Sequence, residues 1–172
     1  MPELSSPRGL ETANRPTFAR RAVDYFTVDL PWGRRQPGLG RFSTAAVVSV
    51  LGSLAACAVI VSIGTAIFPA TAGYEHFRFL DYAKLTVPGV VAASLAWPVV
   101  TLFSSRARRL FAWLTVVVTL GGLAPDAWIL YRGDAPEAVL VLVVMHLALA
   151  AVTYPALVYI APQRTGSGTR DL

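Results

Sequence analysis

Four long apolar runs fill the chain after residue 41, and each contains almost no charge. They span 42–68, 85–103, 110–130 and 138–161. An α-helix rises ~1.5 Å per residue, so about twenty residues cover the ~30 Å hydrocarbon layer of a bilayer. The pattern therefore predicts an all-α integral membrane protein, with a four-helix transmembrane bundle over 42–161, an N-terminal arm over 1–41 and a flexible tail over 162–172.

Aromatic side chains mark the expected membrane interfaces. The segment 22–32 gathers aromatic and aliphatic residues between two aspartates, which is typical of a stretch lying in the headgroup zone, where amphipathic rings settle. A docking segment for a partner protein is the alternative interpretation. The expected interfacial anchors in this arm and in the third span are Tyr25, Phe26, Trp32, Trp113 and Trp128.

The net charge of +5 is unevenly distributed over the connections between the runs. Of fifteen Lys and Arg residues, all but three lie before the first run, between the second and third, or after the fourth. These segments share one side of a four-span protein, so the positive-inside rule predicts cytoplasmic N- and C-termini in a bacterial plasma (inner) membrane. Because most arginines border spans, contact with anionic lipid explains them, and no nucleic-acid partner is expected. The long polar arm also predicts an uncleaved signal anchor.

The first run carries small residues at intervals of four. Together with a glycine on an adjacent row, the expected helix-packing residues are Ala45, Ser49, Gly52, Ser53 and Cys57. Small side chains let membrane helices approach closely. The packing neighbour can be another span of this chain or a different subunit. Cys57 is the single cysteine, so no intrachain disulfide is possible.

The connection 69–84 and the prolines carry further expectations. Aromatic and charged residues alternate along this connection, which favours a short helix resting on the membrane surface. Pro98 lies well inside the second run, where a proline is expected to kink the helix and free a backbone carbonyl.

Two ionisable residues fall inside the apolar runs, where such groups are costly and usually functional. Asp126 lies ~6 Å and His146 ~12 Å below the same membrane boundary, at ~1.5 Å per residue. A short turn joins their two helices, so a contact between them is possible. Thr153 and Tyr154 lie on the face adjoining His146 and complete the set of intramembrane polar candidates.

Three interpretations of this pair are open. In the first, His146 is neutral and bonds a carbonyl freed by Pro98 or Pro125, while Asp126 reaches the interface. In the second, the pair is a proton-carrying or ligand-binding site, because histidine can change charge near neutral pH. In the third, one of the two residues pairs with another subunit.

The chain contains no recognisable catalytic set. It has no phosphate-binding glycine loop, no Cys–His metal cluster and no GxSxG elbow. We therefore expect no catalytic residues, no metal, no cofactor and no enzymatic activity.

From Pro88 onward the chain resembles a family of small bacterial four-span proteins known only as a domain of unknown function. The likeness lies in three stretches: SSRARR at 104–109, LFAW at 110–113 with Pro125 later in that span, and MHLALAA at 145–151. It covers the last half of the chain well and the first span loosely. The resemblance implies a four-span bundle with a histidine in the last helix, which His146 matches, whereas Asp126 matches no position of the family pattern.

These observations predict a non-enzymatic multi-pass membrane protein that acts as an accessory or stabilising subunit of a larger membrane complex. Its expected partners are the lipid bilayer and other membrane subunits. The alternative is a small transporter or proton-linked channel that uses His146 and Asp126. A water-filled cavity reaching His146 would favour the alternative, and a dry, close-packed interior would remove it.

Overall fold

A computed structural model describes residues 24–25 and 36–164 of the chain. Its long helices are α2 (Leu39–Ile67), α3 (Phe79–Phe103), α4 (Ala107–Tyr131) and α5 (Pro136–Pro155). Its short elements are η1 (Pro69–Thr71), η2 (Glu75–Phe77) and η3 (Ala156–Ile160), a π-helix that continues α5. Four helices of the described residues are long and apolar enough to cross a membrane, counting α5 and η3 as one. The prediction of an all-α bundle is confirmed, and the protein is a four-span membrane protein.

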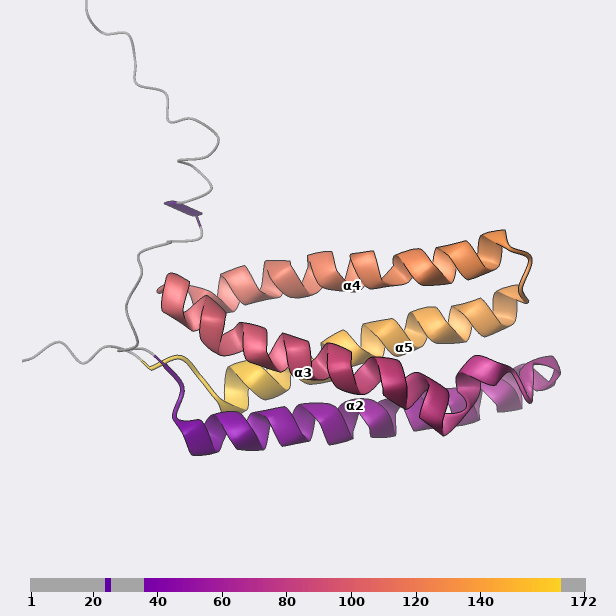
Figure 1. The fold of residues 1–172 in the computed structure, drawn as a ribbon, viewed down its shortest axis with the longest axis horizontal. Coiled ribbons are helices and arrows are strands. Elements are labelled where there is room, and N and C mark those ends of the chain that lie inside the picture. The colour runs from indigo at the N-terminus through magenta and orange to yellow at the C-terminus, as the bar shows by residue number, and fades with distance from the viewer. Residues whose placement is uncertain (1–23, 26–35, 165–172) are drawn as a thin grey trace, which may run out of the picture.

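The four helices lie side by side with alternating direction (Figure 1). Helix α5 packs extensively against both α2 and α4, and α3 packs on α2, whereas α3 and α4 contact each other less. One end of the bundle, which we call the loop end, carries η1, η2 and the turn between α4 and α5. The opposite end, the terminal end, carries the start of α2, the α3–α4 connection and the end of η3. The α4–α5 turn includes Gly133 with a φ of 98°, which favours glycine.

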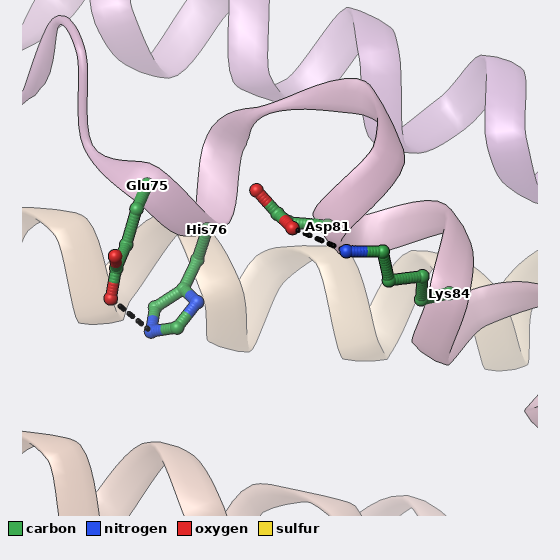
Figure 2. Close-up of polar contacts among 4 residues, drawn as sticks. All are labelled: Glu75, His76, Asp81 and Lys84. Atoms are coloured by element: carbon green, nitrogen blue, oxygen red, sulfur yellow. Dashed lines mark hydrogen bonds and ion pairs between the residues drawn. The ribbon is translucent and has the colours of Figure 1, made fainter.

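The second span begins six residues earlier than expected, at Phe79 instead of residue 85. The predicted surface helix over 69–84 is therefore wrong: its first half forms two 3₁₀ turns and its second half is the start of α3. Asp81 and Lys84 stabilise this helix start, with Lys84 Nζ 3.0 Å from Asp81 Oδ1 (Figure 2). Asp81 also lies in the first turn, where the helix dipole favours an acid. Helix α3 then continues as a single helix through Pro98.

Two clusters of buried side chains hold the bundle together. The terminal-end core consists of Ala45, Trp97, Val100, Ala107, Phe111, Leu157, Val158 and Ala161. The loop-end core consists of Cys57, Phe77, Tyr82, Ala138, Val141, Leu142 and Met145. Because the membrane supplies no hydrophobic drive between helices, close packing and interhelical hydrogen bonds hold these clusters together.

The small-residue row of α2 faces the interior of this same bundle. Ala45, Ser49, Ser53 and Cys57 are all fully buried. Ser53 Oγ lies 3.3 Å from Thr153 Oγ1 of α5, and a Cβ on Gly52 would lie only 2.9 Å from Val152. Of the two neighbours left open by the sequence, the structure therefore places a span of this chain against the row.

The predicted arm (1–41) and tail (162–172) fall largely outside the described residues, and so do the expected anchors Phe26 and Trp32. The other expected anchors are exposed: Tyr25, Trp113 and Trp128.

Candidate functional site

The structure brings Asp126 and His146 together near the loop end. Asp126 comes from α4 and His146 from α5, and the short turn 132–135 holds the two helices antiparallel. Nδ1 of His146 lies 3.0 Å from Oδ2 of Asp126. The same nitrogen lies 3.1 Å from the backbone oxygen of Leu142, one turn earlier in α5. Among the described residues, Asp126 forms an ion pair with His146 and with no lysine or arginine.

One ring nitrogen thus faces two acceptors. Although Oδ2 is within bonding distance of Nδ1, its alignment is poor, and it makes no hydrogen bond within the described part of the chain. The Leu142 carbonyl has the better alignment with Nδ1. A buried carboxylate oxygen without a hydrogen bond is costly. A small rotation of the imidazole that points a proton on Nδ1 at Oδ2 is therefore favourable.

This geometry differs from the first interpretation of the pair. The carbonyl facing His146 belongs to Leu142 and is not one freed by Pro98 or Pro125. Asp126 does not reach the interface, since only 3% of it is exposed. Because the α4–α5 turn is short, α5 places His146 beside Asp126.

Acidic and aromatic groups surround the loop end above the pair. Burial raises the pKa of the Tyr74 hydroxyl, and the carboxylates of Asp134, Glu75 and Asp126 raise it further. The Tyr74 hydroxyl is buried and makes no hydrogen bond to a described residue. His76 packs edge-on against the Tyr74 ring and lies 3.9 Å from Glu75 (Figure 2). The loop end therefore places titratable groups in one electrostatic environment with Asp126.

A cavity of about 530 Å³ lies between α3, α4 and α5, and His146 lines it. Its other polar lining residues are Thr115, Thr119, Thr153 and Tyr154, and the remainder are apolar or glycine. Thr115 bonds the Phe111 carbonyl at 2.8 Å, and Thr153 contacts Ser53. The cavity is the space left where α3 and α4 contact each other least.

An aromatic stack closes this cavity toward the terminal end. The Phe111 ring lies 5.1 Å from that of Trp97 and stacks 5.8 Å from that of Tyr154. Trp97 Nε1 donates to the Ala161 carbonyl at 2.8 Å, which fixes its ring. Phe111 and Tyr154 line the cavity, whereas Trp97 packs against Phe111 from the terminal-end core.

Sequence reasoning identified His146, Asp126, Thr153 and Tyr154 but missed the cavity wall. Thr115, Thr119 and Gly122 recur at helical spacing on α4, and Gly89, Ala93 and Ala96 do so on α3. These two rows were the available signal, but a row of small residues predicts contact as readily as a gap. No group of three His, Cys, Asp or Glu side chains that could hold a metal occurs in the described ranges.

Comparison with known proteins gives one match. The model of a family described as "Family of unknown function (DUF6069)" matches residues 33–163. The match covers all four spans. It therefore includes the first span, where the resemblance seen in the sequence was loose. No curated protein and no solved structure matches the chain.

Proposed function

We infer that this chain, which belongs to the DUF6069 family of unknown function, is a non-enzymatic four-span protein that binds a proton at Asp126–His146 and links it to a small molecule in the α3–α4 cavity. The observation that carries the proposal is the 3.0 Å contact between a buried carboxylate and an imidazole that also lines the cavity. The family supplies no activity, so the argument depends on the chain's own residues.

The chemistry of the pair suits reversible proton binding. An imidazole can both accept and donate a proton, which makes histidine a common proton carrier. Protonated, the imidazole can donate to Asp126 from Nδ1 and carries a second N–H at Nε2. When it releases the Nε2 proton, the remaining Nδ1–H can still donate to Leu142 or Asp126. Ionisable groups inside a bundle are expensive and are typical of proton relays.

The surroundings of the pair support access from the loop end. The connection between α2 and α3 contributes Tyr74, Glu75 and His76 to the surroundings of Asp126. The α4–α5 turn adds Asp134. From α2 and α3, Cys57 and Tyr82 lie in the adjoining loop-end core. The carboxylates of Glu75 and Asp134 thus lie at the loop end, on the side from which a proton would reach the pair.

The aromatic stack favours a carrier over an open channel. The stacked rings of Phe111 and Tyr154 line the cavity toward the terminal end, and its lining is mostly apolar. A continuous water-filled pore would need polar groups along its whole length. A carrier, in contrast, binds a small molecule and a proton at a site that is open to only one side of the membrane at a time.

Proton flux into vesicles tests this function. Purified protein in liposomes, with a pH-sensitive dye inside and an imposed pH gradient, is expected to carry protons at a rate that depends on pH. His146→Leu is expected to lower the rate on the order of a hundredfold, because a positioned proton-transfer group contributes at least that much.

The matched control is His76→Leu, which removes the other histidine of the chain, at the exposed loop, and is expected to retain most of the flux. Equal flux through the wild type and His146→Leu, with both proteins folded, would remove the proposed proton role.

That negative outcome would favour the second candidate, an accessory or stabilising subunit of a larger membrane complex. The outward face of α4 is available to such a complex or to lipid, because Val117 and Leu120 are exposed there. The small-residue row of α2 no longer supports it, since α5 already covers that row.

A further inference from the structure

The α3–α4 cavity has the dimensions of a small-molecule site. Its volume is about 530 Å³, and ligand sites in proteins occupy roughly 300–1,000 Å³ with apolar walls and a few polar groups. Its α3 wall runs from Leu85 to Ala96, which is ~16 Å at ~1.5 Å per residue. Exposed Leu85 and Val118 form its rim, so it opens sideways between α3 and α4, toward lipid.

The depth of the cavity places it in the hydrocarbon layer. Leu85 is the first residue of the second apolar run and follows the exposed Lys84, so it lies at the edge of that layer. His146 lies ten residues below the start of α5, or ~15 Å, which is near the middle of a ~30 Å layer. A phospholipid headgroup belongs at the interface and does not reach His146. The occupant is therefore a molecule dissolved in the hydrocarbon layer itself.

The lining indicates an uncharged occupant. Among the residues that the structure describes, no lysine, arginine, aspartate or glutamate lines the cavity, and His146 is already paired with Asp126. A charged ligand at this depth would lack a counter-ion, which is costly in hydrocarbon. Charge complementarity thus selects a neutral molecule.

Two polar groups converge on one side of the cavity. Nδ1 of His146 faces Asp126, which leaves Nε2 for a ligand. A Cβ on Gly122 would lie 3.1 Å from His146 Cδ2 and 3.5 Å from Nε2, so the glycine lets the ring pack closely against α4. Thr119, three residues away, lines the cavity, and its hydroxyl makes no hydrogen bond within the described residues. An imidazole nitrogen that accepts and a hydroxyl that donates or accepts together suit a hydroxyl group.

We propose that the α3–α4 cavity binds an uncharged, membrane-soluble small molecule carrying one hydroxyl group. The hydroxyl lies between His146 and Thr119, and the apolar part lies along Gly89, Ala93 and Ala96. This deepens the proposed function by naming the substrate class; the link to a proton rests on that function, whereas the binding does not.

Photolabelling of the full chain in phospholipid nanodiscs tests the proposal. The probe is a decanol that carries a diazirine, and mass spectrometry locates its adducts. Adducts are expected on the cavity-facing residues of α3 and α4, between Leu85 and Ala96 and between Phe111 and Gly122. Unlabelled decanol is expected to compete about tenfold more strongly than decane, the difference that one hydrogen bond provides.

Two filling variants and one control locate the site. Ala93→Phe occupies the cavity and is expected to lower labelling about tenfold, and Ala96→Leu, a smaller change, should lower it less. Leu95→Phe adds bulk to the exposed face of the same helix, outside the cavity, and should label as the wild type does. His146→Leu should abolish the preference for decanol over decane.

Three outcomes would overturn the proposal: equal labelling of Ala93→Phe and Leu95→Phe, equal competition by decane and decanol, or displacement of the probe only by phospholipid. The result also separates the two proposals. Specific decanol binding without proton flux leaves the hydroxyl site standing and removes the proton role, whereas flux without binding does the reverse.

Discussion

Asp126 shows how one residue links the chemistry of this bundle to its packing. It is buried where α4, α5 and the loop end meet, and its Oδ2 atom depends on the His146 ring for a partner. Glycines on α2 contribute to packing alone, since they permit close contacts with α5 that any side chain would block. Gly64 is the clearest case: an added Cβ would lie 2.6 Å from Val141 Cγ2, a distance that real Cβ contacts do not adopt.

Gly64→Ala is therefore expected to destabilise the protein. Val141 is almost fully buried and β-branched, so it cannot move aside easily. Overpacking of this kind costs about 1–3 kcal/mol, which outweighs the gain of about 0.5–1 kcal/mol from replacing a helical glycine. Thermal unfolding in detergent, followed by tryptophan fluorescence, measures the change.

Gly121→Ala is the matched control, because nothing lies within 4 Å of an added Cβ on that helical glycine. This substitution should leave the midpoint temperature of thermal unfolding unchanged or raise it slightly. A Gly64→Ala protein as stable as Gly121→Ala would contradict the close α2–α5 contact.

At the scale of elements, the π-helix η3 depends on other helices to satisfy its end. The last carbonyls of a helix have no partner within it. Here Arg41 Nε of α2 donates to the Ile160 carbonyl at 2.8 Å, and Trp97 Nε1 of α3 donates to that of Ala161. Gln163, just beyond η3, donates to the Ser104 carbonyl in the α3–α4 connection at 2.7 Å. Three elements therefore anchor the fourth span at the terminal end.

Trp97→Phe tests this anchoring. The substitution keeps an aromatic ring beside Phe111 but removes the donor and leaves a buried carbonyl unpaired, at a cost of about 1–3 kcal/mol. The thermal midpoint in detergent should fall accordingly. Trp113→Phe, at an exposed position of α4, should change stability by less than about 0.5 kcal/mol; equal effects of the two substitutions would show that the anchor contributes nothing.

For the whole molecule, the bundle has two chemically different ends. The loop end carries Glu75, Asp81, Asp134 and Glu137, and the terminal end carries Arg106, Arg108 and Arg109. This asymmetry supports the expected orientation, with the terminal end in the cytoplasm. In that orientation the proposed proton site lies nearer the outer end of the bundle than the cytoplasmic end.

Cysteine labelling in intact cells tests the orientation. Asp134→Cys should react with a membrane-impermeant maleimide added outside, whereas Arg164→Cys should react only after permeabilisation. The wild type is the blank, because Cys57 is its single cysteine and is fully buried. The reverse pattern would invert the topology and place the proton site toward the cytoplasm.

The sequence by itself determined the four helices, since a chain in hydrocarbon must satisfy its backbone hydrogen bonds locally and uncharged runs of this length have no other solution. It also brought Asp126 and His146 within reach, because a short turn forces their helices together. Only the tertiary structure decided that α3 starts at Phe79, that Leu142 shares the His146 ring nitrogen with Asp126, and that α3 and α4 leave a cavity. Those features depend on how side chains from three helices fill a common volume, and periodicity along one helix carries no information about that volume.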